Sequence, residues 1–398
     1  MNELPRIEIT PIVRRRASYD IGFLDEASAR RVAAFHASFP MYAETPLAAL
    51  PSLAKTLGVR GLYVKDESFR FGLNAFKALG GSYAAGQYIA KRLGLDISEL
   101  PFARMVSEEI RARLGDVTFV TATDGNHGRG VAWTARQLRQ RAVVYMPRGT
   151  KAERLENIRR EGADASILDD TYDGCVRHAA RMAAENGWVL TQDTDFEGYR
   201  EIPRWIMEGY GTMALEAYRQ IPEPPTHIFL QAGVGSMAGA VAGFFANVLP
   251  GAARPIITVA EPETADCVFR TARAADGRLH AAGGDLETMM AGLACGEPCG
   301  LAWEVLESCA DFALVCTDEV SARGMRLLAR PTGGDPRVVS GESGAVTTGL
   351  AATLLTHRDA YPDIIDALGL DERSVILCFS TEGATDRENY RRVTGTGP

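Results

Sequence analysis

The chain lacks the features that mark membrane, secreted and nucleic-acid-binding proteins. No apolar run approaches the roughly 18 residues that a membrane span needs. The first ten residues, MNELPRIEIT, lack the basic and then apolar order of a signal peptide. A formal net charge of −8 argues against binding to nucleic acid. We therefore expect neither a membrane nor a nucleic acid as a partner.

Cysteine is scarce and follows no metal-site or disulfide pattern. The seven cysteines include no Cys-x-x-Cys pair, and Cys295 and Cys299 have no histidine nearby to complete a zinc site. We therefore expect no metal centre. An odd number of scattered cysteines is typical of reduced, buried thiols in a cytoplasmic enzyme, although spacing alone leaves open a pairing of Cys267 with Cys295.

Two common nucleotide-binding motifs are also missing. The glycine-rich loop QAGVGSMAG, residues 231–239, contains no GxxxxGK[ST], and it lacks a full GxGxxG with a later acidic residue. Gly233 and Gly235 would nevertheless let backbone amides converge ahead of a helix N-terminus, which favours a phosphate, and Ser236 adds a hydroxyl. A tight strand-to-helix turn explains the same residues, so this motif alone leaves both interpretations open.

What the chain does contain is a repeated order of strand and helix. Apolar and β-branched runs predict strands at 117–123, 141–147, 163–169, 226–235, 256–262 and 374–383. Helical spacing follows the first four of these runs, at 128–138, 151–162, 174–187 and 236–249. This order predicts an α/β fold with mainly parallel sheets covered on both faces.

The length of 398 residues predicts two domains. We predict a larger domain formed by residues 1–85 and 189–398, and a smaller inserted domain formed by residues 86–188. Ligands of such sheets bind at the carboxyl ends of the strands, where the loops TDGNHGRG, QDTDFEGY and STEGATD stand. Asn126, in the first loop, offers both a donor and an acceptor, although an Asp-Gly turn explains that loop equally well. His127 by itself is more typical of a structural histidine.

The segment NAFKALGG, residues 74–81, places Lys77 between apolar and small residues. An apolar niche disfavours the charged form of an amine, which makes the amine a nucleophile towards an aldehyde. We therefore predict that Lys77 points inward and is reactive. Lys65, in VKDES, stands beside acidic residues, and we expect it at the surface or behind the site.

Four motifs together resemble those of a known family. NAFKALGG, DGNHGRG, GVGSMAG and SGESGA resemble the lysine, asparagine-loop and phosphate-loop motifs of the fold-type II pyridoxal-phosphate enzymes. That family includes threonine dehydratase and the tryptophan synthase β subunit, and the sequence is most similar to the diaminopropionate ammonia-lyases, from about Phe39 to Tyr390. The resemblance implies two open, twisted, mainly parallel sheets flanked by helices, a bound pyridoxal 5′-phosphate and a homodimer.

The resemblance also implies a role for each matching residue. Lys77 would form the Schiff base with the cofactor and act as a base, and Asn126 would bind the ring hydroxyl oxygen. Thr381, with Ser380 as a second candidate, would face the pyridine nitrogen, where a neutral hydroxyl favours elimination over transamination. The phosphate would be held by Gly233, Val234, Gly235, Ser236 and Met237.

Acidic residues distinguish between substrates. Asp124 stands where dehydratases of hydroxyamino acids usually carry a serine-rich turn, and a second acidic loop contains Asp193 and Asp195. Carboxylates that gather at one cofactor repel each other unless a cation joins them, and the β-ammonium group of 2,3-diaminopropionate is such a cation. We therefore predict α,β-elimination of L- and D-diaminopropionate to pyruvate and two ammonia, with Lys77, Asp124 and Asp193 as catalytic residues. Helix capping or turn chemistry explains Asp195 equally well.

Two other functions stay open on the sequence alone. A serine or threonine dehydratase is the first, and a neutral pocket would be expected for it. The second is a catalytically silent pyridoxal-phosphate carrier or regulatory protein on the same fold. The presence of Lys77 together with both acidic loops argues against the second.

Overall fold

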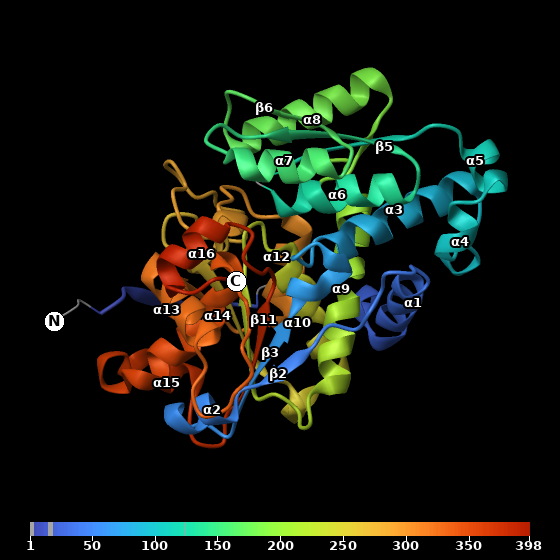
Figure 1. Ribbon diagram of the computed structural model, residues 1–398. Coiled ribbons are helices and arrows are strands. Elements are labelled where there is room, and N and C mark those ends of the chain that lie inside the picture. The colour runs from blue at the N-terminus through green and yellow to red at the C-terminus, as the bar shows by residue number, and fades with distance from the viewer. Residues whose placement is uncertain (1–3, 15–18, 124) are drawn as a thin grey trace.

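Two β-sheets organise the chain in the computed structural model, which describes residues 4–14, 19–123 and 125–398. Among these residues, the larger sheet has seven strands in the order β1-β10-β9-β8-β11-β3-β2, and the smaller has four in the order β6-β5-β4-β7. In Figure 1 the smaller sheet and its helices form the upper part of the molecule, and the larger sheet lies below. The predicted α/β fold with two mainly parallel sheets is confirmed.

The central strands of the larger sheet are parallel and buried. They are β10 (Phe312–Cys316), β9 (Ile256–Pro262), β8 (His227–Gln231), β11 (Val375–Ser380) and β3 (Gly61–Asp66). The edge strands β1 (Ile7–Pro11) and β2 (Leu47–Ala49) run antiparallel to their neighbours.

Helices cover both faces of this sheet. α10 (Ser236–Val248) and α14 (Glu342–Thr356) both pack on β8, and their apolar side chains belong to two separate core clusters. Along β8, Ile228 and Leu230 join the first cluster and Phe229 joins the second. Burial on both faces explains why these strands are continuously apolar in sequence.

The smaller sheet is parallel throughout. Its strands are β6 (Asp164–Ile167), β5 (Arg141–Met146), β4 (Thr118–Ala122) and β7 (Val189–Leu190). Helices α6 (Asn126–Gln137), α7 (Ala152–Arg160) and α8 (Tyr172–Asn186) pack on it. Because β7 belongs to this sheet, the sheet continues to residue 190, and the domain limits at residues 86 and 188 stay a prediction.

Helix α3 (Ala78–Leu93) connects the two parts of the molecule and begins directly after Lys77. It packs against α6 on one side and against α9 (Glu201–Gln220) on another. A Cβ atom on Gly130 would lie 3.0 Å from the backbone nitrogen of Ala78, and one on Gly209 would lie 2.6 Å from the carbonyl oxygen of Leu79. Larger residues would therefore force α6 and α9 away from the start of α3.

Lys65 does not lie at the surface, so that alternative of the prediction is wrong. Its side chain is fully buried, with Nζ 2.7 Å from the carboxylate of Glu216. Glu216 also accepts from Arg70, which in turn pairs with Glu67. This buried cluster of two cations and two carboxylates ties β3 and the 3-10 helix Glu67–Gly72 to α9, and so anchors the segment that leads into Lys77.

The seven cysteines are buried and form no disulfide, so the pairing left open for Cys267 and Cys295 is not present. Within the described ranges, no group of three or more His, Cys, Asp or Glu side chains is arranged to hold a metal ion. No helix in the described part of the chain has the length and apolar character to cross a membrane.

Candidate active site

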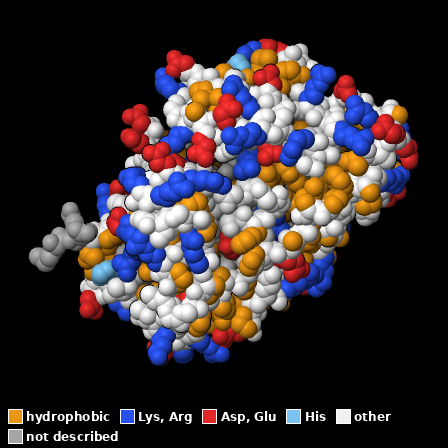
Figure 2. Space-filling model, viewed as in Figure 1, with side chains coloured by type: hydrophobic (Ala, Val, Ile, Leu, Met, Phe, Trp, Pro, Cys, Tyr) orange, Lys and Arg blue, Asp and Glu red, His pale blue; other side chains and the backbone are white. Residues whose placement is uncertain are grey.

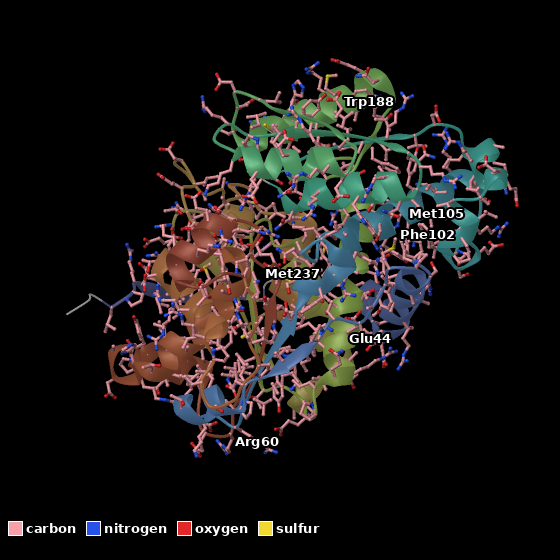
Figure 3. The ribbon with its side chains drawn as sticks, in the orientation of Figure 1. Glu44, Arg60, Phe102, Met105, Trp188 and Met237 are labelled. Carbon is pink, nitrogen blue, oxygen red and sulfur yellow. The ribbon has the colours of Figure 1, made fainter. Side chains whose placement is uncertain are left out.

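A cavity between the two sheets brings together most of the predicted site residues. Together with the open solvent at its mouth, it contains about 670 Å³ of empty space. Its walls include the loops that follow β4, β7, β8 and β11, at the carboxyl ends of parallel strands. Figure 3 labels Met237, one of the lining residues, near the middle of the molecule. The predicted residues that line the cavity are Lys77, Asn126, Asp193, Gly233, Val234, Gly235, Ser236, Met237 and Thr381.

Two predicted residues are not in this set. Asp124 lies outside the described residues. Ser380 is fully buried behind the cavity wall, where its hydroxyl donates to the hydroxyl of Ser340 at 2.8 Å. Of the two candidates for the pyridine nitrogen, only Thr381 therefore faces the cavity.

Lys77 and Asp193 form an ion pair inside the cavity. Nζ of Lys77 lies 2.5 Å from Oδ2 of Asp193, and the two side chains are 21% and 3% exposed. The neighbours of Lys77, Phe76 and Ala78, are apolar and buried as predicted. The amine itself does not lie in an apolar niche, because it contacts the carboxylate of Asp193. A carboxylate at this distance favours the charged form of the amine, so the amine must leave Asp193 before it can act as a nucleophile.

Asp193 is held from both sides of its carboxylate. Burial would raise its pKa, but the neighbouring His127 and Lys77, together with the hydrogen bond from Lys77, outweigh burial and hold the pKa well below its ordinary value. Where His127 carries no proton, Lys77 is the cation that opposes burial. Oδ1 accepts from Nε2 of Gln192 at 3.3 Å and from the hydroxyl of Tyr172 at 3.4 Å. Asp193 is therefore an oriented anion at neutral pH.

The loop after β8 forms a cradle for an anion at the start of α10. Gly235 has a φ of 96°, in the left-handed region that favours glycine, and the helix begins at the next residue. The first N–H groups of a helix have no acceptor within the helix, so they are available to a phosphate. The hydroxyl hydrogen of Ser236 is committed to the carbonyl oxygen of Asp193 at 2.6 Å. Ser236 can therefore serve a phosphate through its backbone N–H.

Thr381 follows β11 and is oriented by Gln231. Nε2 of Gln231 donates to Oγ1 of Thr381 at 2.8 Å, and also to the carbonyl oxygens of Ser343 and Phe379 at 3.0 and 2.9 Å. Because the Thr381 hydroxyl accepts from Gln231, its own hydrogen can point to an acceptor in the cavity. A pyridine nitrogen without a proton is such an acceptor.

Asn126 stands at the start of α6 and meets Glu382 from the opposite wall. Nδ2 of Asn126 donates to Oε2 of Glu382 at 2.5 Å, and Oε1 of Glu382 accepts from the backbone N–H of Ser343 at 3.0 Å. The amide nitrogen carries a second hydrogen, with which it can bind the hydroxyl oxygen of a ring.

Asp195 lies outside the cavity and caps a helix. Its carboxylate accepts from the backbone N–H of Leu301 at 3.1 Å, in the first turn of α12 (Gly300–Cys309), and lies 3.5 Å from Nε of Arg200. The capping explanation for Asp195 is confirmed.

The sequence did not identify several residues of the cavity wall. Gln231, Ser343 and Glu382 lie within motifs that were singled out, at positions next to the ends of strands or at the start of a helix. That position was the signal that could have identified them. Tyr172 and Cys295 also line the cavity, and they come from segments in which no motif was apparent.

A cleft beside the cavity carries charges of both signs, because its walls contain Asp170, Asp285, Glu287, Asp318, Glu342 and Asp386 as well as cations. Tyr172 borders both the cavity and the cleft, and the walls of the cleft include Arg148, Lys151, Arg154 and Arg392. Figure 2 shows Lys and Arg side chains along the boundary between the upper and lower parts of the molecule. Lys151 forms an ion pair with Asp386 between the two parts.

Comparison with known proteins relates nearly the whole chain to enzymes of one kind. A family model described as "Pyridoxal-phosphate dependent enzyme" matches residues 39–363. The chain is 47% identical to the diaminopropionate ammonia-lyase of Salmonella typhimurium over 392 residues, which are 96% of either protein. It is also 47% identical to that of Escherichia coli strain K12, over 94% of this chain and 92% of the relative.

Solved structures agree with these relatives. A holo diaminopropionate ammonia lyase from Escherichia coli matches with a TM-score of 0.90 at 43% identity, over 98% of this chain and 97% of that one. Threonine dehydratases are more distant: the chloroplastic enzyme of Arabidopsis thaliana is 25% identical over 62% of this chain and 39% of its own length.

Proposed function

Because the chain belongs to the family of pyridoxal-phosphate dependent enzymes and has the predicted fold-type II architecture, we propose that it converts 2,3-diaminopropionate and water into pyruvate and two ammonia. The ion pair of Lys77 with the buried Asp193 carries this proposal. A carboxylate beside the reactive amine suits a substrate that brings a second ammonium group. The similarity to diaminopropionate ammonia-lyases over 96% of the chain supports the same substrate.

Pyridoxal 5′-phosphate fits the groups that line the cavity. When bound, it supplies an aldehyde that condenses with amines and a ring that delocalises the electron pair left by a removed α-proton. Lys77 would hold it covalently, and the segment from Gly233 to Met237 would hold its phosphate. Thr381 would face the ring nitrogen, and Asn126 the ring hydroxyl.

Three residues of the chain would then act on the substrate, each in a different role. Asp193 would bind the β-ammonium group and orient the bond that breaks. Lys77, freed as a neutral amine, would take the α-proton of the L isomer. Asp124 would take the α-proton of the D isomer from the other side. A structure of the Escherichia coli relative in complex with D-serine, at 42% identity, supports a site that admits D-configured amino acids.

A serine or threonine dehydratase is the second candidate function. The relatedness to threonine dehydratases favours it in general terms. Against it, a buried anionic Asp193 gains no counter-charge from the neutral hydroxyl of serine or threonine, whereas the β-ammonium group of diaminopropionate provides one.

A substrate panel tests the proposal. The purified protein, loaded with pyridoxal phosphate, is assayed for pyruvate and ammonia from L- and D-diaminopropionate and L-serine, and for 2-oxobutyrate and ammonia from L-threonine. We expect diaminopropionate to have the highest kcat/KM, with two ammonia for each pyruvate. A higher kcat/KM for serine or threonine would establish the dehydratase instead. Bound cofactor without turnover of any substrate would establish the silent carrier.

We also propose a homodimer in the cytoplasm. The homodimer rests on the family resemblance, and seven buried cysteines without a disulfide support a reducing compartment. Sedimentation equilibrium tests the first statement, and localisation of a tagged full-length chain in fractionated cells tests the second.

A further inference from the structure

Nδ1 of His127 faces the carboxylate of Asp193 and has no hydrogen-bond partner in the described structure. The histidine is 2% exposed, and its Nε2 lies 2.8 Å from the carbonyl oxygen of Thr191. Because a carbonyl oxygen only accepts, Nε2 carries a hydrogen, and Nδ1 of the neutral ring presents a lone pair. A lone pair that faces a carboxylate is unfavourable, whereas a proton on Nδ1 would make the contact attractive.

One carboxylate thus faces two possible cations. Oδ2 of Asp193 lies 2.5 Å from Nζ of Lys77 and 3.8 Å from Nδ1 of His127. Burial lowers the pKa of His127, Asp193 opposes this, and the Lys77 ammonium lowers the pKa further. Among the described residues, Asp193 and Lys77 are the charged groups that act on His127, and the Thr191 carbonyl is its other polar contact. While Lys77 is on Asp193, His127 is therefore neutral.

Lys77 cannot remain the cation throughout the proposed reaction. In one state its nitrogen is bonded to the cofactor, and in another it is a neutral amine that accepts a proton. In neither state does Lys77 begin as an ammonium ion paired with Asp193. A carboxylate buried without a cation takes up a proton itself. A neutral Asp193 could not bind the β-ammonium group of the substrate.

We propose that His127 is the reserve cation of Asp193: its Nδ1 takes up a proton when Lys77 ceases to be an ammonium ion, and releases that proton to water when another cation occupies Asp193. An N–H bond at Lys77 breaks and an N–H bond at Nδ1 forms, so the total charge of the three groups does not change. His127 acts through Asp193 and is a positioning residue. The departure of Lys77 from Asp193 rests on the proposed function. The geometry of His127 and Asp193 does not.

A purely structural histidine is the alternative. The hydrogen bond from Nε2 to the Thr191 carbonyl ties the start of α6 to the segment after β7, as a structural histidine would. That explanation accounts for Nε2, but it gives no reason for the unpartnered Nδ1 to face a carboxylate. The two explanations differ in whether His127 changes its charge.

NMR of the full chain with ¹⁵N-labelled histidine measures that charge directly. The chain has six histidines, and the His127 signals are assigned by their loss in His127→Gln. We compare the protein freed of cofactor, the cofactor-loaded protein and cofactor-free Lys77→Ala. The pKa of His127 should be about one to three pH units higher in the last two, because Asp193 has lost its ammonium partner. The same pKa in all three would overturn the proposal.

The Lys77→Ala arm uses neither substrate nor cofactor, so it can fail or succeed independently of the proposed function.

The second readout is the pH profile of KM for diaminopropionate in cofactor-loaded His127→Gln. Glutamine keeps a donor for the Thr191 carbonyl but cannot become charged. We expect KM to rise several-fold towards low pH, with a smaller change in kcat. His280→Gln, away from the cavity, is the control. A folded His127→Gln with the wild-type KM profile would show a structural role only.

Discussion

Lys77 and Asp193 stand 116 residues apart in the chain, yet Nζ and Oδ2 lie 2.5 Å apart in the cavity. Lys77 directly precedes α3, which is packed between the two parts of the molecule, and Asp193 follows the short strand β7 of the smaller sheet. The reactive amine and its counter-charge are therefore fixed by different elements. A shift of either sheet against α3 would separate them, which couples the chemistry of the site to the packing of the whole chain.

The first prediction concerns Lys77→Ala. Lys77 is the only lysine that lines the cavity within the described residues, so its loss should remove both the visible absorbance of covalently held cofactor and the pyruvate release. The control is Lys91→Ala, an exposed lysine paired with Glu201, which should change neither. A Lys77→Ala protein that keeps absorbance and turnover would exclude Lys77 as the anchor.

The second prediction tests the phosphate cradle through Gly235. Gly235→Asp should weaken binding of pyridoxal phosphate, because it puts a carboxylate among N–H groups suited to a dianion. Gly235→Ala is the control that adds backbone strain without charge. An added Cβ would lie 3.5 Å from the nearest atom, so it would not clash, and the positive φ would cost an alanine about 1–2 kcal/mol. The Kd of the cofactor, measured by fluorescence, should rise at least about tenfold more for Asp than for Ala. Equal Kd values for the two variants would contradict a phosphate site here.

The third prediction concerns Asp193→Asn. Asparagine keeps the shape but removes the charge that would hold the β-ammonium group. Loss of one member of a buried charge pair costs about 2–5 kcal/mol, so kcat/KM for both isomers of diaminopropionate should fall by about 30-fold or more. Any turnover of L-serine should fall less, because serine has no β-ammonium group. An equal loss for both substrates would show that Asp193 serves the cofactor or Lys77 alone.

Of the five central strands of the larger sheet, the sequence predicted β8, β9 and β11 and missed β3 and β10, although β10 is apolar and largely buried. β8, β9 and β11 are mostly apolar, and each lies within the run that predicted it. The predicted run matches the limits of β9, but the runs for β8 and β11 extend several residues beyond the strands. β3 was missed because Lys65 and Asp66 interrupt its apolar pattern. The charge of Lys65 is tolerated there only because Glu216, from α9 far along the chain, reaches it in the core.

The same physical reason limits what could be predicted of the site. Motif residues that follow strands came together as expected, because parallel strands present their carboxyl ends on one edge. Contacts between loops could not be read from any single segment. The apolar neighbours of Lys77 gave no sign of Asp193, and Asp195, two residues away in the same loop, points instead to the start of α12.

The fourth prediction is a pH dependence of stability caused by Glu342. Burial, and then the nearby Glu382, raise the pKa of Glu342 to about 7. The folded protein therefore binds a proton between about pH 4.5 and 7 that the unfolded chain releases, so the free energy of unfolding falls as pH rises through this window. The contribution is about 3 kcal/mol at most. In urea titrations, Glu342→Gln should flatten this slope, and Glu388→Gln, exposed nearby, should leave it unchanged. A slope retained in Glu342→Gln would assign it to other groups.

The fifth prediction separates the two isomers of the substrate through Asp124, which lies outside the described residues, so it rests on the sequence alone. The α-protons of the L and D isomers point to opposite faces of a bound cofactor. If Lys77 serves one face, the D isomer needs a second base on the other, and Asp124 is the acidic residue of the loop that contains Asn126. Asp124→Asn keeps the shape and the hydrogen bonds of the side chain but removes the base.

Pyruvate release from D-diaminopropionate by Asp124→Asn should therefore fall by about 100-fold or more, the usual range for loss of a general base. Release from L-diaminopropionate should survive at least in part, because Lys77 is intact. Asp193→Asn is the matched comparison: it changes the same atoms at the ammonium site and should reduce the turnover of both isomers alike. If Asp124 only shapes the turn before Gly125, its replacement will affect both isomers equally or hardly at all. An equal fractional loss for L and D in Asp124→Asn would thus rule out two bases, and would leave Lys77 as the group that must reach the α-proton of either isomer.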